Sequence, residues 1–237
     1  MANLCCFSKS GKYVFESIKS FLKKNNKIND QWNSLNIISE NASTVGSFDL
    51  GIFQSNDGSN QILNNLNNHK YEIVFLLGQD SLNFIKKNEF VIYQGTHGDK
   101  GAEIADIILP GSAYTEQDGY FTNMEGKLQK AFKASYPPGE AKEDWQIIND
   151  LSECINNKKL FTNKEELDSS LINYLNLFKQ KNLSKSCSDL LNLDFINEKI
   201  EINNIDYYYS NSIARASKTM FRCRSEKIKL KSTGTAG

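Results

Sequence analysis

The chain has 237 residues, of which 39% are hydrophobic and 11% aromatic, so it is long enough to bury a globular core. Its 28 basic residues balance 28 acidic ones, which excludes the strongly positive field of a general nucleic-acid binder. The longest uninterrupted apolar run, residues 73–77, is much shorter than the ~20 residues that a membrane-spanning helix needs.

The cysteine content favours a reducing compartment. The five cysteines are an odd number and include no C-x-x-C pair: Cys5, Cys6, Cys154, Cys187 and Cys223. This pattern predicts neither a disulfide framework nor a zinc or iron–sulfur site within this chain.

The N-terminal region predicts a strand-like apolar opening at residues 4–7, followed by a helix. The helix would carry one apolar stripe, formed by Val14, Phe15, Ile18, Phe21 and Leu22. These residues recur at helical spacing, and lysines occupy the remaining surface. The alternative interpretation is a basic amphipathic transit peptide, because the first 27 residues contain several lysines and serines.

Residues 32–50 predict a segment that is helical at first and is broken by Gly46 and Gly51. A polar loop follows. The apolar residues Ile62, Leu63 and Leu66 then predict a short helix.

Three apolar strands are predicted in the centre of the chain, at residues 72–78, 90–95 and 105–110. A short helix is predicted between the first two, at residues 81–87, and Pro110 stops the third because it lacks an amide hydrogen. Strands that are apolar throughout, rather than alternating, are typical of a parallel sheet covered by helices. The fold class predicted is therefore α/β.

Glycines follow the second strand at Gly95, Gly98 and Gly101. They could form a loop that holds a dinucleotide phosphate, but their spacing does not match G-x-G-x-x-G and no long helix follows. The preferred interpretation is a tight loop, in which glycine permits positive φ and close passage of the backbone.

A histidine and several carboxylates cluster in the same part of the sequence: His97, Asp99, Glu103, Asp106, Glu116 and Asp118. They could be metal ligands or an acid–base set. However, they lie among Gly, Ser and Thr, where carboxylates commonly cap backbone amides in turns. We therefore interpret them as turn residues. Two hairpin turns are also predicted here, at Asp118-Gly119 and at Glu125-Gly126.

Two helices are predicted next. The first would bury a face that includes Trp145, Ile148, Leu151 and Ile155. The second would begin at a capping box formed by Thr162 and Glu165 and bury Leu167, Leu171, Leu175 and Phe178. Residues 180–204 are polar and poorly periodic, which indicates a surface excursion.

The C-terminal region is strongly basic, with seven cations against Glu226: Arg215, Lys218, Arg222, Arg224, Lys227, Lys229 and Lys231. A solvated tail is one interpretation; contact with an acidic protein partner or an anionic lipid is the other. The aromatic run at residues 207–209 favours docking, because aromatic and arginine side chains are enriched at protein interfaces.

Three segments of the chain read, in this order, WNSLNIISENASTVGSFDLG, FVIYQGTHGDKGAEIADIILPGSAYTEQDGYFTNMEGKLQKAFKASYPPGEAKEDWQIINDLSE and YYYSNSIARASKTMFRC. They resemble the large iron–sulfur subunits of respiratory complex I, a family descended from molybdopterin oxidoreductases. Residues 56–70 and 161–204 diverge from the family. The resemblance places the first helix inside the family's domain, which argues against the transit peptide.

The resemblance implies an α/β, molybdopterin-oxidoreductase-like domain at residues 1–160, with a partly parallel sheet flanked by helices. Residues 161–204 would be a helix and an irregular surface excursion, and residues 205–237 a C-terminal docking tail. The chain would correspond to the C-terminal portion of the family's subunit, as the product of a split gene, and its fold would be incomplete without a partner chain.

The function implied is a non-catalytic, structural portion of the peripheral arm of complex I, on the matrix side of the mitochondrial inner membrane. Iron–sulfur clusters would be held by the partner chain with the N-terminal half, and other peripheral-arm subunits would be neighbours. No catalytic, cofactor-binding or metal-binding residue is assigned in this chain, and neither nucleic acid nor a direct membrane span is expected.

Two alternatives remain. The first is a fragment of an active molybdopterin-dependent oxidoreductase, in which His97, Asp118 and Glu125 would lie near a pterin. The second is a regulatory α/β module unrelated to respiration.

Overall fold

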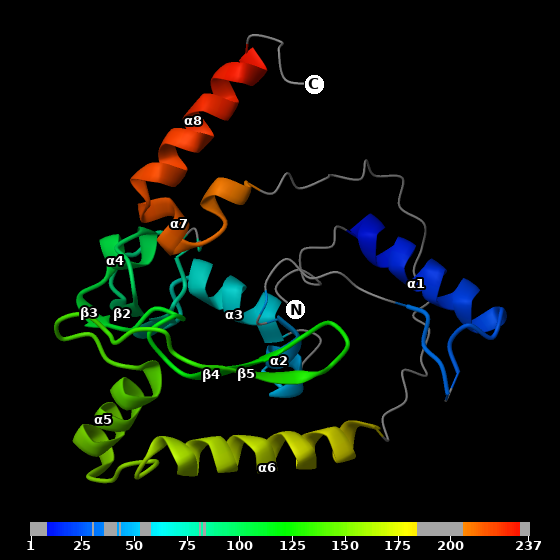
Figure 1. Ribbon diagram of the computed structural model, residues 1–237, viewed down its shortest axis with the longest axis horizontal. Helices are drawn as coiled ribbons and strands as arrows, with labels where there is room; N and C mark the ends of the chain where they lie inside the picture. Colours follow the sequence, from blue (N-terminus) through cyan, green and yellow to red (C-terminus); the bar gives the residue numbers. More distant parts are fainter. Residues whose placement is uncertain are drawn as a thin grey trace. The chain divides into compact units, whose positions relative to one another are not determined.

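The computed structural model describes residues 9–29, 31–35, 42, 44–52, 58–80, 82, 84–183 and 206–232 (Figure 1). The chain divides into two compact units. Unit 1 comprises Met1–Ile62, Gly119–Ala131 and Phe161–Ile202, and unit 2 comprises Leu63–Asp118, Phe132–Leu160 and Asn203–Gly237. The expected domain limits at residues 160 and 204 stay predictions.

The elements are interleaved between the units along the chain. Unit 1 contains α1 (Lys9–Lys24), α2 (Thr44–Asp49), β4 (Gly119–Thr122), β5 (Leu128–Ala131) and α6 (Lys164–Leu183). Unit 2 contains β1 (Ile73–Leu77), β2 (Phe90–Gly95), α4 (Lys100–Ile104), β3 (Ile107–Pro110), α5 (Asp144–Asn156), η1 (Tyr207–Tyr209), α7 (Ser212–Ala216) and α8 (Lys218–Ser232). Helix α3 (Gly58–Asn67) enters unit 2 at Leu63. Among the described helices, none combines the length and apolar character needed to cross a membrane.

Unit 2 is built on a parallel sheet of three strands in the order β1-β2-β3. The predicted α/β fold with a parallel sheet is confirmed. Strand β2 is central because it pairs with both β1 and β3, and it is the most completely buried: Val91, Tyr93 and Gln94 are each at most 1% exposed. Buried, apolar central strands are characteristic of parallel sheets, whose connections lay helices or loops over the faces.

The connection from β1 to β2 is not helical in its described part, residues 82 and 84–87, so the predicted helix at residues 81–87 is wrong. Contacts distant in sequence hold this connection in place. Phe84 is buried in the core, and the Lys86 ammonium bonds to Ile104 O at 3.1 Å and to Asp106 at 2.6 Å. These contacts outweigh the weak local helix preference of so short a segment.

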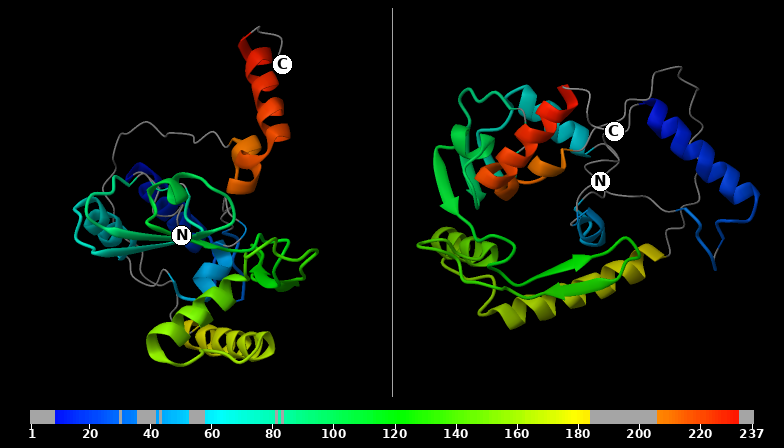
Figure 2. Two further views of the ribbon diagram at one scale, coloured as in Figure 1. Left: turned by 90° about the vertical axis from the view of Figure 1, so that its left-hand side faces the viewer. Right: turned by 45° about the horizontal axis from the view of Figure 1, so that its top comes forward.

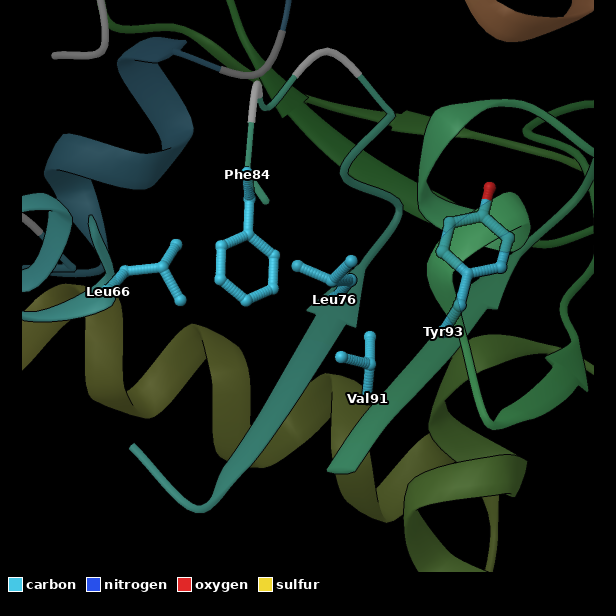
Figure 3. Packing of buried hydrophobic residues seen from close by; sticks show 5 residues of the cluster. All are labelled: Leu66, Leu76, Phe84, Val91 and Tyr93. Atoms are coloured by element: carbon cyan, nitrogen blue, oxygen red, sulfur yellow. The ribbon is translucent and has the colours of Figure 1, made fainter. Parts of the chain in front are cut away.

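The core of unit 2 lies on one face of the sheet. Leu76 and Val91 point from neighbouring strands toward Phe84 and toward Leu66 of α3 (Figure 3). All four side chains are at most 8% exposed. Each buried aliphatic or aromatic side chain of this size contributes about 1.5–3 kcal/mol, so this cluster holds α3 and the β1–β2 connection against the sheet.

Unit 1 contains the antiparallel pair β4–β5, joined by the turn predicted at Glu125-Gly126. Gly126 has φ +80°, and the Asn123 side chain accepts hydrogen bonds from the amides of Glu125 and Lys127. This turn prediction is confirmed. The turn predicted at Asp118-Gly119 is wrong, since Gly119 begins β4 and Asp118 instead accepts the Lys133 amide at 2.8 Å.

Helices α2 and α6 correct two further predictions. Gly46 lies inside α2 instead of breaking a helix, while Gly51, at φ +71°, follows its end. The N-terminal cap of α6 lies one residue later than predicted, at Asn163 and Glu166 instead of Thr162 and Glu165. Asn163 Oδ1 accepts from Glu166 N at 2.9 Å, and the Glu166 carboxylate accepts from the amide and hydroxyl of Thr162.

The buried face of α5 differs from the predicted one. Ile147 is buried, whereas Ile148 is 38% and Ile155 75% exposed. Adjacent isoleucines offered two helical faces, and the tertiary contact of the helix selected the other one.

Candidate functional site

The carboxyl ends of β1, β2 and β3 meet at one edge of the sheet in unit 2, because the strands are parallel. Ligands of open α/β sheets bind outside this edge. The segments that follow the strands are residues 78–80, 96–99 and 111–113. The second of these segments contains His97, Gly98 and Asp99, which the sequence singled out, and Gly95 and Gly101 lie just before and after it. This edge is therefore the candidate site.

A tyrosine fills the centre of the site. Tyr93 is 1% exposed, and its Oη donates to Asp80 Oδ1 at 2.7 Å and lies 3.2 Å from the carbonyl oxygen of His97. Burial, followed by the hydrogen bond and charge of Asp80, raises the pKa of Tyr93. The phenol therefore stays protonated at neutral pH and acts as a hydrogen-bond donor.

Two of the three glycines give room to this ring. A Cβ added at Gly95 would lie 2.1 Å from Tyr93 Oη, and one at Gly101 would lie 2.7 Å from its ring carbons. The predicted close backbone passage is confirmed at these two positions. The predicted positive φ is not confirmed, since neither Gly95 nor Gly101 lies in the left-handed region. The loop thus encloses a side chain of its own chain.

A second polar cluster joins the sheet to the start of α5. Gln94, fully buried, donates through Nε2 to Asp144 Oδ1 at 2.8 Å. Gln117 donates to Asp144 Oδ2 at 3.0 Å and accepts the Asp144 amide at 3.2 Å. The backbone passes close as well, because a Cβ at Gly111 would lie 2.9 Å from Asp144 Oδ1.

The C-terminal segment reaches the same edge. Asp99 caps α4 by accepting the Lys100 amide at 2.9 Å and also forms an ion pair with Arg215 of α7. Accordingly α7 lies beside α4 in Figures 1 and 2. Burial raises the pKa of Asp99, but Arg215 and the Lys100 amide outweigh it, so the net shift is downward. Asp99 is therefore a carboxylate at neutral pH.

The rest of the C-terminal segment is held mainly by its own contacts. The Arg224 guanidinium lies 4.7 Å from the centre of the Tyr209 ring and pairs with Asp206. Lys227 lies 5.4 Å from the ring of Tyr208. These cation–π contacts attach α8 to η1, while Lys218 and Arg222 remain exposed.

The histidine and carboxylates that could have formed a metal or acid–base set serve separate roles. His97 Nδ1 lies 3.0 Å from Thr96 Oγ1, Glu116 accepts the Ala113 amide at 2.9 Å, and Asp106 accepts the Val91 amide at 2.7 Å. Within the described ranges, no three His, Cys, Asp or Glu side chains gather as a metal site. These bonds fit the interpretation as turn residues for the residues named, but the interpretation is wrong for Glu103, which lies within helix α4.

The central residues of the site, Tyr93, Gln94 and Asp144, were not predicted. Gln94 carried one available signal, since it is a polar residue at the end of an otherwise apolar strand. The partner Asp144 lies 50 positions away in sequence, and no local pattern connects the two.

Comparisons with known proteins identify similar sequences across most of the chain. The family model described as molybdopterin oxidoreductase matches residues 5–154. The chain is 38% identical over 225 residues to the NADH-ubiquinone oxidoreductase 75 kDa subunit of Reclinomonas americana, covering 91% of this chain and 32% of that protein.

Two further relatives give the same result. An NADH-quinone oxidoreductase subunit of Rickettsia bellii is 37% identical over 228 residues, covering 94% of this chain and 32% of the relative. The mitochondrial NADH-ubiquinone oxidoreductase 78 kDa subunit of Candida albicans is 35% identical over 232 residues, covering 91% of this chain and 31% of the relative. The chain thus spans about a third of the length of these curated relatives.

The residues at the sheet edge do not fit an anionic, phosphate-bearing pterin. Three carboxylic acid side chains line the edge: Asp80, Asp99 and Asp144. The negative charges of carboxylates repel a phosphate at a partly desolvated site. Arg215, a cation at the same edge, is already paired with Asp99, and the Tyr93 ring fills the space between two of the glycines.

Proposed function

Because this chain belongs to the molybdopterin oxidoreductase family, and its relatives are subunits of NADH-quinone and NADH-ubiquinone oxidoreductases, we propose that it is a structural portion of the peripheral arm of respiratory complex I. In this role it would support electron transfer from NADH to ubiquinone through cofactors held in partner chains. The observation that carries the proposal is the similarity to these subunits over 91% or more of this chain.

The arrangement at the sheet edge supports a scaffolding role over a catalytic one. The polar groups at the centre of the edge are bonded to each other: Tyr93 to Asp80, Gln94 to Asp144, and Asp99 to Arg215. These bonds fix the side chains relative to one another, although Gln94 Oε1 has no hydrogen-bond partner among the described residues. The same residues are poorly suited to hold a phosphate-bearing cofactor, because carboxylates would face its negative charge.

The proposal includes partners and a location. The main partner would be a separate chain that carries the N-terminal, iron–sulfur part of the same subunit, whose relatives are named as subunits of NADH-ubiquinone and NADH-quinone oxidoreductases. Other peripheral-arm subunits are the remaining neighbours. The location is the matrix side of the mitochondrial inner membrane, supported by the Candida albicans relative, which is described as mitochondrial.

Native electrophoresis tests the proposal. The chain is tagged in the source organism, membranes are solubilised with a mild detergent, and the native gel is stained for NADH dehydrogenase activity. We expect the tagged chain to migrate in the active, high-mass band and to lose that position when the band is dissociated. Migration outside every NADH-dehydrogenase-active assembly contradicts the proposal.

Metal analysis of the same purified band separates the proposal from the active-oxidoreductase alternative. After the assembly is dissociated, the isolated chain is expected to contain no stoichiometric molybdenum, because its sheet edge presents carboxylates and a paired arginine. One molybdenum per chain, measured by inductively coupled plasma mass spectrometry, would support the alternative instead.

A further inference from the structure

The two faces of the unit 2 sheet differ sharply in burial. Residues paired across parallel strands point to the same face, and successive residues alternate. Val74, Leu76, Val91 and Tyr93 therefore share one face, which packs against Leu66 and Phe84. The residues of the opposite face are Ile73, Phe75, Leu77, Phe90, Ile92, Gln94, Ile107 and Leu109. We call this the open face.

The open face is apolar and accessible. Its exposed fractions are 64% at Ile73, 41% at Phe75, 56% at Leu77, 43% at Phe90 and 44% at Ile107. None of the strand residues on this face carries a charge. A contiguous apolar surface of this kind is rare on a monomeric protein and marks an interaction site.

The carboxyl end of this face is closed at β2, whereas Leu77, the residue paired with Gln94 on β1, is 56% exposed. Gln94 is fully buried there and is bonded to Asp144 at the start of α5. The accessible part therefore comprises β1 from Ile73 to Leu77 and the amino ends of β2 and β3, where the pairs Ile73–Phe90 and Ile92–Ile107 lie. A partner must pack over this part of the sheet.

We propose that an amphipathic α-helix of a second chain packs on the open face and completes the α/β domain. Parallel sheets are covered by helices on both faces, whereas sheet-on-sheet packing, which a second copy of this chain would produce, is typical of antiparallel sandwiches. The helix would present aliphatic residues at spacings of three and four, because the face offers it no charged partner. Its polar side would face away from the sheet.

The source of the helix is the partner chain proposed above, so this inference rests on the proposed function. The relatives are about three times as long as this chain, which covers 32% of them. The remaining length offers ample sequence for a helix that belongs to the same domain. The proposal thus names the surface through which the two chains assemble.

Photo-crosslinking tests the surface in the intact cell. Phe75→p-benzoylphenylalanine places a reactive aromatic group on the open face, and Tyr114→p-benzoylphenylalanine, at an aromatic side chain that is 62% exposed in the same unit, is the matched control. We expect the Phe75 variant to form an adduct with a second polypeptide at a segment with helical apolar spacing. The control should not form this adduct. An adduct only within this chain, or between two copies of it, overturns the proposal.

A charge introduced on the face provides an independent readout. Phe75→Lys should lower the amount of tagged chain in the high-mass band at least fivefold, because the ammonium would be buried under the helix without a partner. Tyr114→Lys should leave it within twofold of wild type. Recovery of the Phe75→Lys variant at the wild-type level overturns the proposal.

The two proposals fail differently in these experiments. If the wild-type chain enters the NADH-dehydrogenase-active band but Phe75 crosslinks only within its own chain, the inference about the open face is wrong and the proposed function stands. If the chain stays outside that band yet Phe75 still crosslinks to a helix of another protein, the open face is a docking surface and the proposed function is wrong.

Discussion

Tyr93 shows how a single side chain shapes the candidate site. Its ring occupies the space left by Gly95 and Gly101, and its hydroxyl is a hydrogen-bond partner of Asp80, which is 8% exposed. A loop with glycines after a parallel strand favours a bound phosphate in nucleotide-binding folds. Here the same backbone freedom accommodates an aromatic ring, and the loop becomes part of the core.

Removal of this hydroxyl should destabilise the chain. Tyr93→Phe leaves Asp80 buried without its phenol partner, and an unsatisfied buried polar group costs about 1–3 kcal/mol. We expect the tagged chain to precipitate from heated lysate at a lower temperature than wild type. Tyr114→Phe, which removes the same atom from an exposed ring, should melt like wild type. Equal melting of both variants would show that the Tyr93 hydrogen bond is energetically neutral.

The buried carboxylate of Glu89 predicts an acid-sensitive contribution to stability. Glu89 accepts the Lys87 amide at 2.7 Å and bonds to His69 Nδ1 at 2.6 Å. The pKa of Glu89 is lowered from 4.5 to about 2. The hydrogen bond from the Lys87 amide is the largest cause, and the backbone amide of Glu89 and His69 lower the pKa further. Because the folded-state pKa is depressed, this contribution is complete above pH 4.5 and is lost as the pH falls toward 2.

Glu89→Gln should therefore make the stability of the chain less dependent on pH in the acid range. At neutral pH the variant should be cleaved faster than wild type by trypsin, because the charged hydrogen bonds are weakened. When cleavage by pepsin is measured directly between pH 4.5 and about 2, the difference between the two should shrink as the pH falls, since the Glu89 carboxylate of wild type becomes protonated as the pH approaches its folded-state pKa. The assay uses the chain within its assembly. A constant difference across this pH range would exclude Glu89 as the source.

At the scale of elements, the β4–β5 turn depends on a left-handed residue. Gly126 has φ +80° and no atom within 4 Å of an added Cβ, so strain in Gly126→Ala would come from the backbone alone. The expected cost is about 1–2 kcal/mol, which would raise the exchange rates of the β4–β5 amides about 5- to 30-fold. Gly98→Ala is the matched control, because that site is open and φ is not left-handed.

The ion pair between Arg215 and Asp99 attaches helix α7 to the sheet edge and makes it a second element-scale test. Arg215→Ala removes the partner of Asp99 and a contact of 3.4 Å with Tyr209 O. Partly exposed ion pairs are worth about 1 kcal/mol or less, so chymotrypsin should cleave after residues 207–209 up to about fivefold faster. Arg222→Ala, at an exposed arginine of α8, should leave the rate unchanged. Equal cleavage of both variants would mean that other contacts hold the segment.

The elements that the sequence predicted well have strong local signals. The three apolar strands and the Glu125-Gly126 turn depend on residue types that few other structures tolerate. Predictions failed where tertiary contacts decided. The segment at residues 81–87 is shaped by the burial of Phe84, and α5 buries Ile147 instead of its neighbour Ile148. The pairs at the sheet edge join residues far apart in sequence, so the site could not be read from any local pattern.

At the scale of the whole molecule, the chain contains two units whose segments alternate along the sequence, and unit 2 leaves one face of its sheet uncovered. Unit 2 has a buried core on one sheet face and an apolar open face on the other. Strands β1 and β3 are both edges of this sheet within the described residues. Exposed apolar faces and unpaired edges promote association, so solution behaviour should depend on a partner.

Expression with and without a partner tests this dependence. Produced alone, the chain should form aggregates or a broad distribution of masses, because the side chains of the open face would meet one another. Co-expression with the proposed partner chain should yield a soluble complex of one copy of each, measured by size-exclusion chromatography with light scattering. Phe75→Lys should reduce aggregation of the isolated chain, since a charge interrupts the apolar face, and should also weaken the complex. A stable, monodisperse monomer of the wild-type chain would show that its two units need no partner to complete them.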